Sequence, residues 1–471
     1  MNHFTSAESA LILGIVAAYI LFTSWLTVRL RSRTTGEFMN AARSMPAAVV
    51  GVLLMSEFIG AKSTVGTAQE AFSSGMAASW SVLGASIGFL LFGLFFARRI
   101  YGSGEYTISA AIAKHYGTST MRTVSIIMMY ALLLVNVGNY VSGAAALSTV
   151  MNLDLTWAMV IIAVVSTFYY VFGGLKGIAY VTILHSALKV VGVALILGVA
   201  LSASGGIAPV MEKLPGHYFT WDGTIGMPTI FAWVIGTVGA IFSTQFIIQA
   251  ISSNRSAKEA QHSAFYAAAF CLPLGIMLAL IGVTAHYLHP DMKSLYALPV
   301  FLDSMHPLMA AVVTTSLVAS VFVSVSTVAL AIASLMVRDF YVPWKKPTPE
   351  QEFRTTRILS LVIGFLPLIF VFFVPEILKL SFFTRALRLS ITVVAVIGFF
   401  LPFFASNMGA TLGLLAATVT TTLWYVLGNP YGIDNMYVAL LTPMAVMGLE
   451  RLFRWKSAPP VLAAPPQADA S

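Results

Sequence analysis

Long apolar runs separated by short polar segments dominate this chain. The runs are about 20–30 residues long, which is the length that a helix needs to cross a bilayer. A membrane β-barrel would instead show segments of about ten residues in which apolar and polar side chains alternate. We therefore predict an all-α integral membrane protein with about thirteen transmembrane helices. We place them at residues 8–28, 46–72, 76–97, 123–150, 155–172, 177–203, 226–252, 263–286, 308–337, 358–374, 376–404, 408–427 and 436–449.

The composition agrees with a membrane protein. Hydrophobic residues make up 58% of the 471 residues and charged residues only 9%, whereas a soluble domain has about 25% charged residues. The single cysteine, Cys271, excludes an intramolecular disulfide. The net charge of +8 does not indicate a nucleic-acid partner, because the basic residues are not gathered in one domain. We expect the lipid bilayer and a small-molecule solute as partners, and the sequence does not fix the oligomeric state.

The basic residues predict an orientation. If the N-terminus lies outside, nineteen of the 26 Lys and Arg residues fall in inside loops and only Lys213 and Lys293 in outside loops. Inside loops of membrane proteins carry an excess of Lys and Arg. The pattern therefore predicts a plasma (bacterial inner) membrane protein with its N-terminus outside and its C-terminus in the cytoplasm.

The spans form one predicted membrane domain, residues 1–454. Residues 46–203 and 226–404 each hold five spans and begin in opposite orientations, which is compatible with a 5+5 inverted repeat. The spans at 8–28, 408–427 and 436–449 would be additional helices. The Ala/Pro-rich residues 455–471 are expected to be a disordered cytoplasmic tail.

The second span has two charged residues near its middle, Glu57 and Lys62. A charge at the centre of a membrane helix costs about 2.5–3.5 kcal/mol and usually marks a substrate or ion pathway. Small residues lie between the two charges, so we predict that the helix is broken over residues 56–64 and that Ser63 and Thr64 face a cavity. Backbone that is not helical is tolerated at this depth only where it lines a cavity. Alternatively, Lys62 pairs permanently with Glu57 and only holds the break in shape.

Other buried polar residues extend the candidate site. The sixth span carries Thr182, His185 and Lys189 on one face, and the eleventh carries Arg385 and Arg388. Because arginine binds carboxylates through a planar fork, we predict an anionic, carboxylate-type solute. The alternatives are packing for the histidine and contacts with other helices or lipid headgroups for the arginines. Amides that either face the cavity or bridge helices are Asn136, Asn139, Gln245 and Gln249.

Four stretches resemble the sodium:solute symporter family. Residues 38–46 (FMNAARSMP) look like that family's F-x-x-A-G-R-S-x-P, and residues 169–177 (YYVFGGLKG) look like its Y-x-x-x-G-G-L-K-A. Residues 245–249 (QFIIQ) and 253–261 (SNRSAKEAQ) resemble its seventh helix and the following loop. The hydroxyl-rich ninth span, ending in MVRDFY at 336–341, resembles its S-S-x-x-S…D-x-Y. The resemblance implies a leucine-transporter-like fold in which the first helix of each repeat is broken.

The resemblance also implies transport of a small solute driven by an ion gradient. The family's sodium site maps onto Ser56 and Ile59 of the second span and onto Ser320 and Ser324 of the ninth, while a further hydroxyl position is Val323 here. The ninth-span hydroxyls could instead bond back to their own helix. Lys62 stands where related sugar carriers have a carboxylate, and it could replace the ion as a tethered cation.

The coupling ion is therefore left open between Na+ and H+. Glu57, Lys62, Thr182, His185 and Lys189 are the candidates for coupling or gating. No organic cofactor and no metal site beyond Na+ is expected. An ion-independent uniporter and a transporter-like membrane sensor are alternatives. A membrane enzyme is not favoured, because His286, His289 and Asp291 form only a weak constellation of possible metal ligands.

Overall fold

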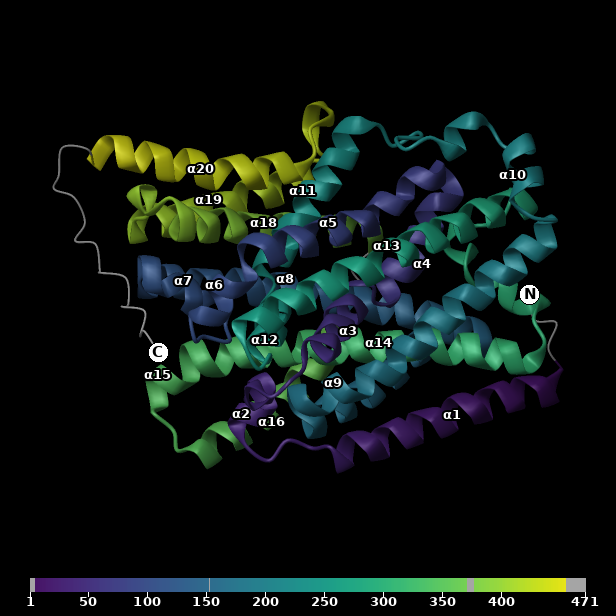
Figure 1. The fold of residues 1–471 in the computed structure, drawn as a ribbon, viewed down its shortest axis with the longest axis horizontal. Coiled ribbons are helices and arrows are strands. Elements are labelled where there is room, and N and C mark those ends of the chain that lie inside the picture. Colours follow the sequence, from purple (N-terminus) through teal and green to yellow (C-terminus); the bar gives the residue numbers. More distant parts are fainter. Residues whose placement is uncertain (1–4, 152, 371–376, 455–471) are drawn as a thin grey trace.

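The computed structural model describes residues 5–151, 153–370 and 377–454 of the chain. Within these residues the regular structure is helical, and the β-contact is an isolated bridge between Met45 and Asn254. The long helices run roughly along the longest axis of the molecule (Figure 1). The predicted disordered tail, residues 455–471, lies outside the described residues.

The α-helices follow the apolar runs of the sequence. In chain order they are α1 (Ser6–Arg29), α2 (Thr35–Asn40), α3 (Ala47–Phe58), α4 (Ala61–Ser74), α5 (Trp80–Phe95), α6 (Ala97–Gly102), α7 (Ile108–Tyr116), α8 (Thr118–Met151), α9 (Leu155–Ser204), α10 (Ile207–Lys213), α11 (Met227–Ser243), α12 (Gln245–Ser252), α13 (Ala257–Leu288), α14 (Pro307–Leu335), α15 (Val342–Lys345), α16 (Pro349–Phe365), α17 (Pro367–Phe370), α18 (Ile377–Phe400), α19 (Asn407–Val426) and α20 (Asn435–Arg454).

The number of membrane spans depends on how broken helices are counted. In the described ranges, ten helices are long and apolar enough to cross a membrane, or up to eleven if the bent pair α11 and α12 counts as one span. The predicted fifth and sixth spans form one element, α9, which is kinked at Gly174. The 12 residues of α3 are too few for a full span on their own. The count of thirteen stays a prediction.

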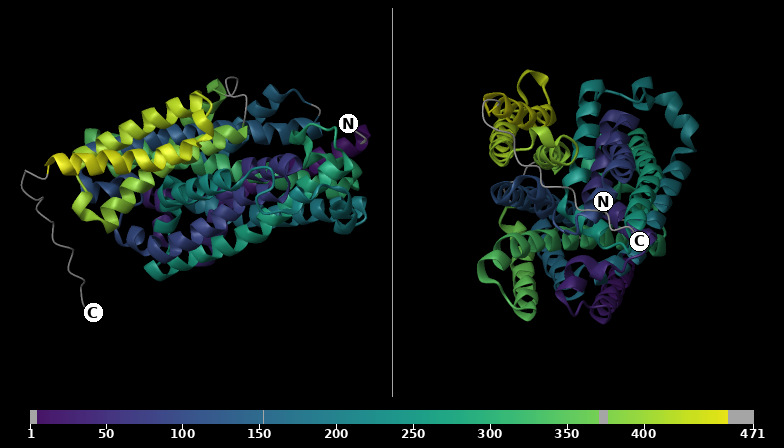
Figure 2. Two further views of the ribbon diagram at one scale, coloured as in Figure 1. Left: turned by 90° about the horizontal axis from the view of Figure 1, so that it is seen from above. Right: turned by 60° about the vertical axis from the view of Figure 1, so that its left-hand side comes forward.

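Two helices form the centre of the bundle. In α14 and α18, 94% of the most apolar window is buried inside the protein, against 22% in α1 and α20. Helix α14 packs against α8 and α9, and α18 packs against α11 and α20. The last two helices, drawn in yellow, lie together along one side of the bundle in both views of Figure 2. Polar residues on α14 and α18 are therefore the ones placed deepest in the protein.

The turn inside α9 locks α9 to the segment that precedes α3. Gly174 has a positive φ of 58°, and a Cβ there would lie 2.7 Å from Phe38 and from the Ser32 hydroxyl. Only glycine fits both this backbone and this space. The Ser32 hydroxyl donates a hydrogen bond of 2.8 Å to the Gly173 carbonyl oxygen. Two of the stretches that resemble the family therefore pack against each other.

An ion pair holds the same turn from the loop side. Lys176 donates to a carboxylate oxygen of Glu37 at 2.7 Å, and this hydrogen bond keeps the pKa of Glu37 below its usual value. The pair therefore stabilises the fold at neutral pH, and its contribution is lost as the pH falls through the lowered pKa of Glu37. Both side chains are partly exposed, so the contribution is at most about 1 kcal/mol.

Candidate functional site

The predicted break in the second span is present. Helix α3 ends at Phe58, and α4 begins at Ala61. Between them Ile59 has ψ 60° and Gly60 has ψ −176°, so the backbone leaves the helical region for these two residues. The Ser63 hydroxyl donates a 2.8 Å hydrogen bond to the carbonyl of Phe58 across the gap. The carbonyl oxygens of Ser56 and Ile59 accept hydrogen bonds from another helix instead.

The ammonium of Lys189, on α9, binds to the backbone at this break. Its Nζ donates to the Ser56 carbonyl oxygen at 2.9 Å, to the Ser56 hydroxyl at 3.0 Å and to the Ile59 carbonyl oxygen at 2.6 Å. Lys189 is only 1% exposed. The side chain of Lys62, the other lysine proposed from the sequence, lies outside the described part of the structure. Among the described side chains, Lys189 therefore provides a tethered cation at the break.

Helix α14 packs on the broken span from another side. It carries three hydroxyl side chains, which make different contacts: Ser320, Ser324 and Thr327. Ser320 donates at 2.8 Å to a carbonyl of its own helix. Thr327 donates to a carboxylate oxygen of Glu57. Ser324 Oγ is buried and has no hydrogen-bond partner among the described residues. A Cβ on Gly60 would lie 2.0 Å from it, so the glycine lets the break approach α14.

A small cavity lies beside the break. Its volume is about 50 Å³, which is room for a few water molecules and not for an organic solute. Its wall includes Glu57, Gly60 and Ser63 from the broken span, Asn139 from α8, Thr244 from the α11–α12 joint, and Arg385 and Arg388 from α18. The broken second span, the fourth span and the eleventh span therefore contribute to one wall, whereas the polar residues predicted on the sixth span do not line it.

The two arginines of α18 are buried in this wall, with exposures of 5% and 8%. Arg385 donates to the Thr237 hydroxyl at 2.7 Å, and its guanidinium lies 5.3 Å from the ring centre of Phe58. Arg388 donates to the Thr244 hydroxyl at 2.9 Å. Neither guanidinium forms an ion pair with a carboxylate among the described residues. An arginine has five N–H donors, so both can bind a further acceptor.

The joint between α11 and α12 is a second broken element. The two helices meet at Thr244 at an angle of 48°. As in the α3–α4 break, a helix begins at the cavity wall. The sequence did not single out Thr244, although the polar residues Ser243, Thr244 and Gln245 in an otherwise apolar span were a signal that could have marked it.

The other predicted site residues lie away from the cavity. Gln245 accepts from the Ile108 backbone N–H and donates to the Tyr106 carbonyl, both at 2.9 Å. Gln249 donates to the Ser334 hydroxyl at 2.9 Å and to the carbonyl of Met39. For these two amides, the helix-bridging alternative describes the structure. The Thr64 hydroxyl donates back to the Gly60 carbonyl oxygen at 3.0 Å.

The three polar residues on the second half of α9 do not form one cluster. His185 Nδ1 lies 2.6 Å from the hydroxyl of Tyr19 on α1. Thr182 is fully buried, and its hydroxyl has no hydrogen-bond partner among the described residues. Of the three, only Lys189 contacts the break. Asn139, by contrast, lines the cavity and donates to Asn136 at 3.3 Å.

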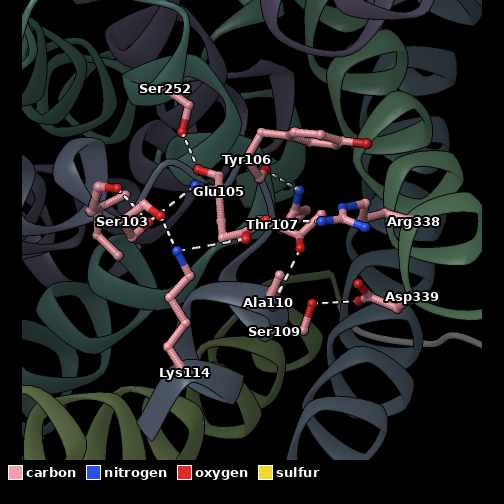
Figure 3. Close-up of polar contacts among 12 residues, drawn as sticks. Ser103, Glu105, Tyr106, Thr107, Ser109, Ala110, Lys114, Ser252, Arg338 and Asp339 are labelled. Atoms are coloured by element: carbon pink, nitrogen blue, oxygen red, sulfur yellow. Dashed lines mark hydrogen bonds and ion pairs between the residues drawn. The ribbon is translucent and has the colours of Figure 1, made fainter. Parts of the chain in front are cut away.

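A polar network lies at the end of the bundle that holds α7 and α15 (Figure 1). Glu105 pairs with Arg338 at 3.2 Å and with Lys114 at 3.7 Å, and its backbone carbonyl accepts from the Ser252 hydroxyl at 2.9 Å (Figure 3). Asp339 accepts from the hydroxyl of Ser109 in the same network. The network joins α7 to α12 and to the π-helical segment Met336–Tyr341 that follows α14. Glu105, Ser252 and Arg338 are far apart in the sequence, and the fold brings them together.

A model of the sodium:solute symporter family matches residues 38–417. The chain belongs to this family. It is 21% identical over 464 residues to a sodium/glucose cotransporter of Vibrio parahaemolyticus, covering 89% of this chain and 85% of that one. It is 25% identical over 362 residues to the human high affinity choline transporter 1, covering 70% and 62%.

Solved structures show the same fold. A Na+-coupled sialic acid symporter in a substrate-bound, outward-open state has a TM-score of 0.82 with 18% identity, covering 97% of this chain and 98% of that one. The nucleobase-cation-symport-1 family transporter Mhp1 has a TM-score of 0.62 with 14% identity, covering 92% and 98%. As a member of this family the protein is a membrane transporter rather than an enzyme, and cation-coupled symport is the activity of its relatives.

Proposed function

We propose that this symporter carries a small anionic solute of the carboxylate type across the membrane by alternating access, coupled to a cation. The observation that carries the proposal is the pair Arg385 and Arg388, two buried guanidinium groups without a carboxylate partner in the described structure, on the wall of the cavity beside the break. A carboxylate accepts two parallel hydrogen bonds from such a group. Glu57 is the acid on the same wall, so the arginines give the wall an excess of positive charge.

Two helix ends add to this preference. Both α4 and α12 begin at the cavity, next to Gly60 and Thr244. The N-terminus of a helix carries a partial positive charge and free N–H groups, and half-helices of transporters point them at anionic groups of the substrate. The solute of the most similar structure described above is also an acid. We also propose that the chain crosses the membrane thirteen times, with ten of the spans in two inverted repeats.

The cavity must enlarge for transport. Its present volume of about 50 Å³ corresponds to a closed state around a few water molecules. We propose that the end with α7 and α15 faces the cytoplasm, because the basic loop residues gather there, and that the chain resides in the plasma (bacterial inner) membrane. The network around Glu105 would then be the inner gate.

The coupling cation is Na+ or H+, with Na+ supported by the names of the family and of its relatives. A second candidate is an ion-independent uniporter. The contact of Lys189 with the break favours a uniporter. A charge that is fixed in the protein can take the place of a bound ion at the break, and transport then needs no ion at that position. Both candidates use the same cavity and the same solute class.

A solute panel tests the proposal. Purified protein in proteoliposomes is offered radiolabelled small monocarboxylates, dicarboxylates and acidic sugars, with glucose and choline as neutral and cationic comparisons. We expect uptake of at least one carboxylate, and competition by other carboxylates rather than by glucose or choline. Uptake of choline or glucose without uptake of any anion would show that the arginines serve the structure and not the solute.

The substitution Glu105→Gln is expected to loosen the inner gate. It removes the charge that pairs with Lys114 and Arg338, both partly exposed, so the closed gate loses up to about 1 kcal/mol. In a Cys271→Ala background carrying Ala110→Cys, beside the network, maleimide labelling of that cysteine should become about two- to fivefold faster. Glu350→Gln, an exposed acid outside the network, is the control. Equal labelling rates in both variants would exclude Glu105 from the gate.

A further inference from the structure

The residues that the family resemblance assigns to sodium do not fit a sodium ion in this chain. The position is bounded by the Ser56 and Ile59 carbonyl oxygens and by α14, and the ammonium of Lys189 lies on both of those carbonyls. We infer that the side chain of Lys189 fills the cation position at the α3–α4 break, so that no sodium ion binds there. The geometry does not depend on the proposed solute; only the consequence for coupling rests on the proposed function.

The ammonium is fully satisfied where it lies. A lysine Nζ has three N–H donors, and the three acceptors at 2.6–3.0 Å are the two carbonyls and the Ser56 hydroxyl. These are oxygens that an ion bound to the broken helix would need. A second cation about 4 Å away would be repelled by about 4 kcal/mol at the effective dielectric constant of partly buried sites. Sodium is therefore excluded both by space and by charge.

The α14 side of the position offers few ligands in addition. Val323 has no side-chain oxygen, and the Ser320 hydroxyl donates to its own helix. Ser324 has a buried hydroxyl without a hydrogen-bond partner in the described part of the chain, and it lies next to Gly60. Hard cations bind several oxygen ligands at once. With the ammonium of Lys189 on both carbonyls of the break and a valine at position 323, fewer oxygens remain here than a hard cation needs.

Close packing of α9 on α14 explains how the lysine reaches the break. Gly192 lies one turn after Lys189, and a Cβ there would lie 2.2 Å from the Ser316 hydroxyl. The glycine lets α9 approach α14, which brings the long lysine side chain over the end of α3. The ammonium then ties α9 to α3 through the hydrogen bonds that an ion would otherwise make.

The consequence concerns the driving force. A sodium ion leaves its site with each transport cycle, but the ammonium of Lys189 remains attached to the carrier. A sodium gradient is therefore not coupled to the solute through this position. Any sodium dependence of the protein must arise from another site.

Sodium binding by the purified protein tests the inference without knowledge of the solute. We measure 22Na+ binding and the melting temperature in NaCl and in KCl for the wild type, Lys189→Ala and the control Lys176→Ala, whose ammonium pairs with Glu37. Lys189→Ala leaves the carbonyls of the break without their cation. It should gain 22Na+ binding and a sodium-specific rise in melting temperature of about 3 °C or more. Wild type and Lys176→Ala should show no such rise.

Other outcomes are also decisive. 22Na+ binding by the wild type that Ser324→Ala abolishes would overturn the inference, and so would a Lys189→Ala protein that is folded and gains no sodium binding. Wild-type binding that Ser324→Ala leaves unchanged, with an additional site in Lys189→Ala, would support it. If Lys189→Ala is recovered folded in neither salt, the wild type decides: 22Na+ binding that Ser324→Ala abolishes overturns the inference, and the absence of any such binding supports it. A chain that fails the solute panel but gains sodium binding in Lys189→Ala refutes the proposed function alone.

Discussion

Uptake of the carboxylate solute is expected to fall by about 30-fold or more in Arg388→Gln and in Arg385→Gln. Glutamine keeps hydrogen-bonding capacity but loses the charge and the planar fork that match a carboxylate. Removing one partner of a buried, hydrogen-bonded charge pair costs about 2–5 kcal/mol, which corresponds to this loss or a larger one. Initial uptake rates in proteoliposomes over a range of solute concentrations measure it.

A structural role of the arginines has a different signature. Their bonds to Thr237 and Thr244 hold α18 against α11 and the α11–α12 joint. The variants Thr237→Val and Thr244→Val remove these bonds and keep both guanidinium groups. If the arginines act on the solute, the threonine variants should retain most of the uptake while both arginine variants lose it. Equal losses in all four variants, together with lowered melting temperatures, would contradict a binding role.

Gly60→Val is expected to reduce transport of any solute by about tenfold or more. The backbone of Gly60 is extended (φ −77°, ψ −176°) and suits any residue, so the constraint is space. A Cβ would lie 2.0 Å from Ser324 Oγ and 3.0 Å from Ser324 Cβ. Valine must therefore push the break away from α14, and such overpacking costs about 1–3 kcal/mol. Uptake rates and melting temperature together report the change.

The matched control is Gly198→Val in α9, where a Cβ would meet nothing within 4 Å. This variant should transport and melt much as the wild type does. The milder change Gly60→Ala should be partly rescued by Ser324→Ala, because the hydroxyl is the nearest clashing atom. Wild-type uptake by Gly60→Val would mean that the close contact of the break with α14 is not needed for the transport cycle.

The sequence predicted the break because its signal is local. Charged and small residues in an apolar run mark backbone that cannot stay helical in lipid, and the structure places the break at Ile59 and Gly60, within the predicted segment. The burial of Arg385 and Arg388 followed in the same way from their depth in an apolar run. Periodicity also located the helices, although it could not show that two predicted spans form the single kinked element α9.

The contacts between distant segments could not be predicted. Both Lys62 and Lys189 lie in apolar runs, and the contact of Lys189 with the break depends on how α9 is rotated and how closely it packs on α14. A small residue, Gly192, decides that packing, and it looks like any other glycine in the sequence. Gln245 and Gln249 were expected at the cavity, but the joint at Thr244 turns both amides toward backbone carbonyls of other segments. The side chain of Lys62 lies outside the described structure, so its role stays a prediction.

Solute accumulation in sealed proteoliposomes under separately imposed gradients tests the central claim most directly. With a carboxylate identified by the panel, we expect accumulation above the external concentration when a cation gradient is directed inward, and loss of that accumulation in Arg388→Gln. A proton gradient alone should suffice if Lys189 replaces sodium at the break, whereas dependence on sodium would require a second ion site. Equilibration without accumulation under either gradient would contradict symport and leave the uniporter.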